Sequence, residues 1–128
     1  MSEKQSLEGQ NNIIEYENIM YLINEEDDTV GVIGCSKIDQ QILIPRSINI
    51  GTKEYYVTRI LPRAFKCSEI KFIQFASNSK LEIIDEDAFT YSTFEKITIP
   101  SSVTYIGKYA FSVCQQLRKI KFPNDSKL

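Results

Sequence analysis

The sequence predicts a β-rich α/β solenoid, in which short coils of similar sequence stack on one another. An Ala-Phe pair recurs at Ala64, Ala88 and Ala110, with spacings of 24 and then 22 residues. A branched residue precedes each pair by four positions, and the apolar alternation typical of a short strand follows it. Because one such unit cannot bury its own apolar side, neighbouring units must stack to share a core. We therefore expect a right-handed array of about three and a half turns, with parallel strands and a single helical turn in each coil.

The composition is that of one globular domain without the residues that most catalytic and metal sites need. The 128 residues are 42% hydrophobic and 25% charged, and the formal net charge is −2. There is no histidine, which excludes Ser-His-Asp and Cys-His arrangements and nearly all common zinc sites. Residues suited to general acid–base chemistry are few and unclustered, so we expect no enzyme activity and no cofactor. The three widely spaced cysteines fit thiols in a reducing compartment better than a disulfide framework.

The N-terminal part is expected to close one end of the solenoid. Residues 1–12 are polar and are predicted to be a flexible terminus. Residues 13–41 are predicted to form a β-hairpin cap, with strands at Ile19–Ile23 and Val30–Cys35. The acidic turn between these strands, residues 24–28, lacks the spacing of a calcium loop and is expected to be a solvated turn. Such a hairpin would cover an apolar end that would otherwise face water.

Residues 42–128 are expected to form the solenoid itself. An insertion in the first coil, residues 48–59, is interpreted as a hairpin that turns at Gly51. The last residues, Phe122–Leu128, repeat the pattern of Phe75–Leu81, so the array stops within a repeat. The chain is therefore either a piece of a longer array or ends in an abbreviated coil. An uncapped apolar end of this kind would support self-association.

Within each coil, the segment that contains the Ala-Phe pair is predicted to be one helical turn. Ala110, Phe111 and Cys114 lie three and four positions apart, so they would share an inward face. The phenylalanines recur at the period of the repeat, which places them in the core rather than in a cofactor site. Cys67 and Cys114 are interpreted as equivalent positions that hold buried, inert thiols.

Two acidic residues stand directly before the second predicted helical turn. Asp85 and Asp87 precede Ala88, at a place where the N-terminus of a helix favours negative charge. A role at the start of a helix therefore explains them better than a catalytic pair of carboxylates.

The strand that ends each coil is expected to turn one row of side chains inward and the next outward. Ile73, Ile97 and Ile120 belong to the inward rows. The outward rows hold five basic residues and one acidic residue on the expected concave face, where solenoids usually bind partners. The candidate binding residues are Lys71, Phe72, Gln74, Glu95, Lys96, Thr98, Arg118, Lys119 and Lys121.

This basic face is predicted to bind a protein partner with an acidic surface. The alternative is a solvated sheet face whose lysines keep the protein soluble and discourage edge pairing. Nucleic acid is a weaker candidate, because the face has one aromatic residue, no recognition helix is apparent and the whole chain is acidic.

The third copy of the repeat resembles a known family. Residues 99–122 read Ile-Pro-Ser-Ser-Val-Thr-x-Ile-Gly-x-x-Ala-Phe-x-x-Cys-x-x-Leu-x-x-Ile-x-Phe, which is similar to the BspA-like, or Treponema pallidum type, leucine-rich repeat. Residues 42–128 follow the pattern, although the second copy has Tyr91 or Ser92 where we place the cysteine and lacks the Ile-Pro opening. The resemblance implies bacterial and protist surface proteins that bind host or matrix proteins.

Two functions follow from these observations. The resemblance favours a non-catalytic protein-binding module of the surface-antigen or adhesion type. The alternative is an intracellular adaptor or structural scaffold protein with no surface role. The sequence shows no signal peptide, which favours the cytoplasm, whereas the resemblance implies the cell surface. It has no run of apolar residues long enough to span a membrane, so we expect no membrane insertion.

Overall fold

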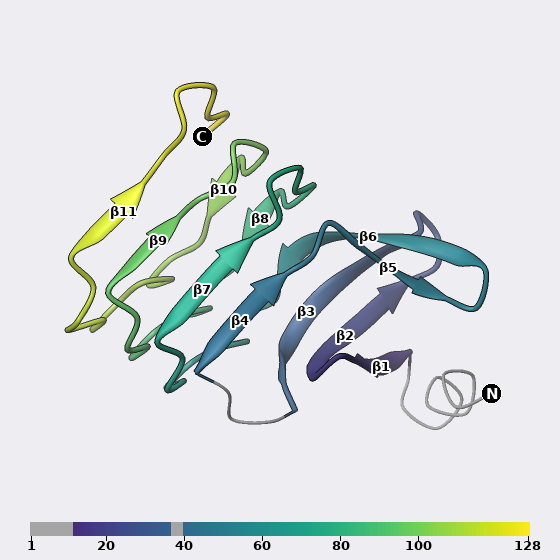
Figure 1. The fold of residues 1–128 in the computed structure, drawn as a ribbon, viewed down its shortest axis with the longest axis horizontal. Helices are drawn as coiled ribbons and strands as arrows, with labels where there is room; N and C mark the ends of the chain where they lie inside the picture. Colours follow the sequence, from purple (N-terminus) through teal and green to yellow (C-terminus); the bar gives the residue numbers. More distant parts are fainter. Residues whose placement is uncertain (1–11, 37–39) are drawn as a thin grey trace.

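The computed structural model describes residues 12–36 and 40–128. Within these residues the chain forms strands, turns and connecting segments and no helix (Figure 1). Residues 1–11, which make up most of the predicted flexible terminus, lie outside the described part. The strands are β1 (Ile13–Tyr16), β2 (Ile19–Asn24), β3 (Thr29–Cys35), β4 (Gln41–Ile44), β5 (Ser47–Ile50), β6 (Lys53–Ile60), β7 (Phe72–Phe75), β8 (Ile83–Ile84), β9 (Lys96–Thr98), β10 (Tyr105–Ile106) and β11 (Lys119–Lys121).

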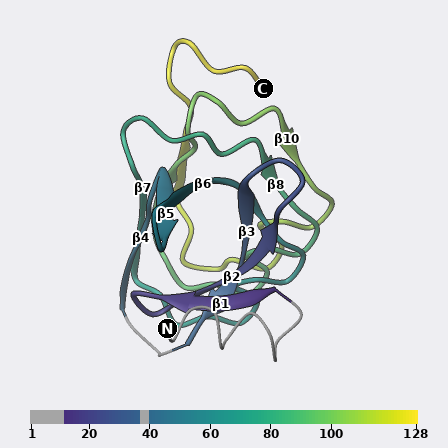
Figure 2. The same cartoon turned by 90° about the vertical axis from the view of Figure 1, so that its right-hand side faces the viewer.

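The strands lie in two layers that run along the stack of coils. One layer is a seven-stranded sheet with the order β1-β2-β3-β6-β8-β10, and β5 pairs with β6 as an antiparallel hairpin. Pairing is antiparallel from β1 to β3 and parallel from β3 to β10. The other layer holds two parallel pairs, β4 with β7 and β9 with β11. The result is a β-solenoid of about three turns, with β1 and β2 at its N-terminal end (Figures 1 and 2).

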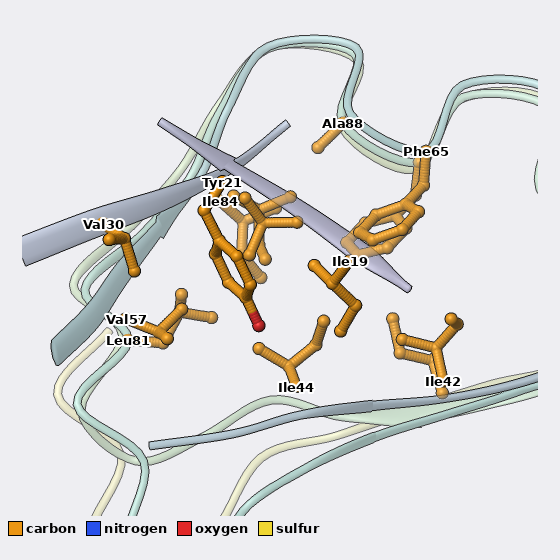
Figure 3. Close-up of a cluster of buried hydrophobic side chains, with 14 of the residues drawn as sticks. Ile19, Tyr21, Val30, Ile42, Ile44, Val57, Phe65, Leu81, Ile84 and Ala88 are labelled. Atoms are coloured by element: carbon orange, nitrogen blue, oxygen red, sulfur yellow. The ribbon is translucent and has the colours of Figure 1, made fainter. Parts of the chain in front are cut away.

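The core lies between the two layers, and the strand alternation explains its composition. Ile19 and Tyr21 of β2 point into the same interior as Ile44 of β4 and Ile84 of β8 (Figure 3). Burial of the Tyr21 ring raises the pKa of its phenol, and nearby Glu17 adds to this effect. The N-terminal strands and the coils therefore share one hydrophobic core.

The predicted helical turns are wrong. An α-helix needs consecutive right-handed residues and hydrogen bonds four residues apart. Instead, Arg63 and Cys67 in the first coil have left-handed backbones with φ of 62° and 61°. The same pair of conformations recurs four residues apart in the next two coils, at positions 87 and 91 and at 109 and 113.

The backbone hydrogen bonds explain why these segments are turns. The N–H groups of Ala64 and Lys66 donate to carbonyls three residues earlier, as in tight turns. The alternate N–H of Phe65 instead donates to Ala88 in the next coil, at 2.8 Å. The N–H of Phe89 repeats this contact with Ala110, also at 2.8 Å. Alternate N–H groups of each turn therefore donate within the turn and to the next coil. The described part of the fold is β-rich and has no α component.

The repeated phenylalanines form a continuous aromatic stack through the core, as the repeat predicts. The rings of Phe65 and Phe89 lie 5.5 Å apart and 7° from parallel. Phe89 and Phe111 lie 5.4 Å apart at 11°. Phe94 meets Phe89 edge-on at 5.4 Å. This stack fixes the register of the three coils.

The equivalence of Cys67 and Cys114 is also wrong. Cys67 is exposed and shares its left-handed backbone with Tyr91 and Val113. Cys114 instead occupies the position of Ser92, one residue further along the repeat, and is half-buried. The one-residue shift arises because the first copy has its cysteine two residues after the phenylalanine, and the third copy has it three residues after.

Candidate protein-binding face

Six of the predicted binding residues lie in β7, β9 and β11, and the other three, Lys71, Glu95 and Arg118, directly precede these strands. All nine of them are exposed, and we call this set the basic strand face. Because side chains alternate along each strand, Ile73 and Ile97 point into the core and the residues on either side of them are exposed. Phe72 is 61% exposed, which is unusual for a phenylalanine in a strand.

The register of the strands sets the neighbours on this face. Lys119 is the partner of Lys96, and Lys121 is the partner of Thr98, in the β9–β11 pair. Phe72 has no such partner in β9, because β7 pairs with β4 and not with β9. The face is therefore two parallel ladders that lie side by side, rather than one continuous sheet (Figure 1).

Sequence reasoning missed the contribution of β4 to this face. Leu43 is exposed and is the register partner of Gln74, and Gln41 is the register partner of Phe72. The signal was present in the sequence, because Ile42 and Ile44 show the same alternation as the later strands. Their side chains are buried and that of Leu43 points outward, so the face extends by one strand toward the N-terminus.

One ion pair lies within the basic strand face. Arg118 donates to the carboxylate of Glu95 at 3.0 Å, and both side chains are mostly exposed. Such a pair contributes little to stability, because water screens it. The lysines of the face make no ion pair with any residue in the described part of the chain, so the face has a formal charge of +4. These lysines are Lys71, Lys96, Lys119 and Lys121.

Two adjoining hollows follow the boundary between β7 and β9. One, of about 780 Å³, includes Phe72 and Glu95 in its lining, and the other, of about 580 Å³, includes Lys119 and Asp125. The two hollows share Ile73, Gln74 and Lys96, so they form one groove along the boundary of the ladders.

Outside this face, the acidic residues singled out from the sequence have structural contacts. Asp85 accepts a 2.7 Å hydrogen bond from the guanidinium of Arg59 and a 2.9 Å bond from its neighbouring backbone N–H. Asp87 accepts one from the hydroxyl of Thr90 at 2.9 Å. They therefore stabilise turns rather than the start of a helix. Among residues 12–36 and 40–128, no group of three His, Cys, Asp or Glu side chains is placed to hold a metal ion.

The repeat assigns the family. Residues 36–127 match the family described as the BspA type leucine rich repeat region, in six copies. The chain belongs to this family. The match includes all four strands of the basic strand face and spans most of the chain, as the sequence pattern predicts.

Solved structures share the fold of this BspA type leucine rich repeat protein. The crystal structure of the pneumococcal vaccine antigen PcpA has a TM-score of 0.65 and is 28% identical, over 91% of this chain and 39% of that one. A leucine-rich repeat protein from Bacteroides capillosus has a TM-score of 0.60 and 18% identity, over 88% of this chain and 99% of that one. The chain thus spans well under half the length of PcpA. No curated protein shows significant sequence similarity to it.

The described part of this BspA type repeat protein contains no helix that is long and apolar enough to cross a membrane.

Proposed function

We propose that this chain is a non-catalytic protein-binding module of the surface-antigen type, and that it binds an acidic partner through the basic strand face. The observation that carries the proposal is the set of four lysines on one exposed strand layer that make no ion pair with residues 12–36 and 40–128. Charges of one sign on a grooved surface attract and orient an oppositely charged partner.

The groove between β7 and β9 gives the basic strand face a concave shape that a partner can fit. Lys71 and Phe72 line the larger of its two hollows, and Lys96 lines both hollows. An extended segment with carboxylates and one apolar side chain would satisfy both the lysines and the exposed ring. The ring of Phe72 is an anchor that such a segment would bury, and buried side chains near the centre of an interface contribute most of its binding energy.

The surface-antigen type rests on family membership and on the likeness to PcpA, which is named as a vaccine antigen. The alternative is an intracellular adaptor or scaffold, which is favoured by the exposed thiol of Cys67. Both functions use the same face, so they differ in compartment and not in chemistry. Labelling intact cells with a membrane-impermeant reagent distinguishes them, because only a surface protein reacts.

The binding test uses a defined acidic probe. A fluorescent peptide of alternating glutamate and leucine is titrated with the wild-type chain and with the variant Lys71→Glu, Lys96→Glu. Charge reversal at the groove is expected to weaken binding at least about tenfold, and added salt is expected to weaken wild-type binding. A peptide with glutamine in place of glutamate is expected to bind weakly to both proteins.

A matched control keeps the same change in net charge away from the face. Arg63 and Lys66 are exposed on a turn of the first coil, outside the groove. The variant Arg63→Glu, Lys66→Glu is expected to bind the acidic peptide within about twofold of wild type. Equal losses in both double variants would show that net charge, and not the basic strand face, attracts the peptide.

A further inference from the structure

The two hollows of the groove between β7 and β9 differ in charge. The larger hollow, of about 780 Å³, is lined by Lys71, Lys96 and Glu95, which give a formal charge of +1. The smaller hollow, of about 580 Å³, is lined by three lysines and by Asp125, which give +2. These lysines are Lys96, Lys119 and Lys121. The smaller hollow is therefore the more strongly basic part of the groove.

The strand register brings these three lysines close together. Lys119 is the register partner of Lys96, and Lys121 lies two residues further along β11 on the same side. Partner strands lie about 4.8 Å apart, and alternate residues of one strand lie about 7 Å apart. Like charges directly opposite each other in a sheet are destabilising, and none of the three lysines makes an ion pair within residues 12–36 and 40–128. An anion bound between them would offset this repulsion.

A neighbouring coil leaves the outward positions of a strand open. Lys96 and Thr98 are exposed although β11 pairs directly with their strand. Their side chains point away from the core, so the next coil lies beside them and does not cover them. Lys119 and Lys121 are the register partners of these two residues and point the same way.

The turns that follow β7 and β9 add hydrogen-bond donors to the smaller hollow (Figure 1). Ser77 and Ser101 line it from equivalent places in these turns. Their hydroxyls and their backbone N–H groups make no hydrogen bond with any described residue, and the same holds for the hydroxyl of Thr98. The hydroxyl oxygen of Ser79 accepts a 3.0 Å hydrogen bond from the N–H of Leu81, so its own proton is available to a ligand.

Lysines with hydroxyl donors and without arginine favour a phosphate group over a carboxylate. A carboxylate fits best against the two-pronged guanidinium of arginine, and no arginine among the described residues lines either hollow. Lysine binds phosphate as a point charge. A phosphate monoester carries up to two negative charges at pH 7 and three strong acceptor oxygens. These properties match the formal charge of +2 and the free hydroxyls of the smaller hollow.

The connection between the hollows indicates that the phosphate is attached to a longer chain. Ile73, Gln74 and Lys96 line both hollows, so a chain that carries the phosphate can continue toward Phe72 in the larger one. We propose that the smaller hollow binds a phosphate monoester, carried by a phosphorylated side chain of the acidic segment that the larger hollow receives. This inference rests on the proposed function, because both use one groove.

The test compares two fluorescent peptides that differ in one side chain. Both alternate glutamate and leucine, and one has phosphoserine in place of a central glutamate. The wild-type chain is expected to bind the phosphopeptide at least about tenfold more tightly at pH 7.5. This preference is expected to shrink at about pH 5, where the phosphate has taken up a proton and carries close to one negative charge.

Two variants distinguish a phosphate site from attraction by charge alone. Lys119→Gln, Lys121→Gln removes two of the three cations and is expected to reduce the preference for the phosphopeptide to about twofold or less. Ser77→Ala, Ser101→Ala leaves the charge unchanged and is expected to reduce the preference at least about threefold. The control Arg63→Gln, Lys66→Gln changes a turn outside both hollows and is expected to keep the full preference. Circular dichroism checks that each variant keeps the wild-type fold.

Inorganic phosphate distinguishes a phosphorylated segment from a free anion. It is expected to displace the phosphopeptide only at concentrations at least about a hundredfold above the dissociation constant of that peptide, because it lacks the contacts of the attached chain. Displacement by equal concentrations would make free phosphate the ligand and would overturn the phosphorylated segment.

The peptides also separate this inference from the proposed function. Equal affinity of the wild type for both peptides would overturn the phosphate site and leave the binding of an acidic segment intact. A full preference in Lys119→Gln, Lys121→Gln would exclude the smaller hollow as the site. Binding of neither peptide would contradict the proposed function as well.

Discussion

The side chain of Ser92 reaches from the second coil to the backbone of the first, where its hydroxyl donates a 3.0 Å hydrogen bond to the carbonyl of Phe65. One coil later, the thiol of Cys114 makes the same 3.0 Å contact with the carbonyl of Phe89. Ser92 is almost fully buried, and its oxygen also lies 3.1 Å from that of Ser68. A small polar side chain at this position therefore links the second and the third coil to the coil before it.

Loss of this contact is expected to lower stability modestly. Ser92→Ala should reduce the free energy of unfolding by about 1 kcal/mol, because it removes a buried hydrogen bond while Phe65 keeps a second donor in the N–H of Ser68. Ser92→Cys, which imitates the next coil, should cost less. Urea denaturation of the wild type and the two variants checks this order. A Ser92→Cys variant that is less stable than Ser92→Ala would contradict it.

Removing a ring from the centre of the aromatic stack should destabilise the protein more than removing one from its end. Phe89 is fully buried between two stacked rings, whereas Phe111 in the third coil is partly exposed. Phe89→Ala should reduce the free energy of unfolding by about 3–5 kcal/mol, and Phe111→Ala by clearly less. Equal losses in thermal or urea unfolding would mean that another surface covers Phe111 in solution.

The ion pair between Arg59 and Asp85 should make stability depend on pH. Burial alone would raise the pKa of Asp85, but hydrogen bonds from Arg59 and from the N–H of Glu86 outweigh it and lower that pKa. A lowered folded-state pKa stabilises the fold above the unfolded value of about 3.9, and this contribution is lost as pH falls through the folded value.

Asp85→Asn should therefore reduce the free energy of unfolding by about 1 kcal/mol near pH 7, and the deficit should shrink below about pH 4. Asp125→Asn is the control, because Asp125 is exposed and makes no ion pair within the described residues. Unfolding curves between pH 3 and pH 7 measure both variants. A deficit that stays constant with pH would show that the lost contact is not ionic.

The two solenoid cysteines should differ in reactivity. Cys67 is exposed, whereas burial raises the pKa of the half-buried thiol of Cys114. Because the thiolate is the reactive form, Cys67 should react with iodoacetamide at least about tenfold faster at pH 8. Mass spectrometry of the labelled peptides measures both rates. Cys67→Ser should abolish the fast phase, and a fast phase that persists would place the reactive thiol elsewhere.

The helical turns show where sequence reasoning fails. Ala110, Phe111 and Cys114 have helical spacing, but the residues that decide the backbone are Tyr109 and Val113, with φ of 63° and 53°. A left-handed valine costs on the order of 1–2 kcal/mol and no propensity rule predicts it. Hydrogen bonds to the neighbouring coil offset this cost, and they exist only once the coils are stacked.

The sequence alone determined the repeat, the inward rows and the membership of the family, because periodic apolar residues encode burial directly. The outward positions of Lys96, Lys119 and Lys121 followed from the same alternation, whereas Lys71 directly precedes its strand. Only the tertiary structure decided that β7 pairs with β4 and not with β9, which produces the groove. Pairing depends on which coils meet in space, and a local pattern carries no information on such long-range contacts.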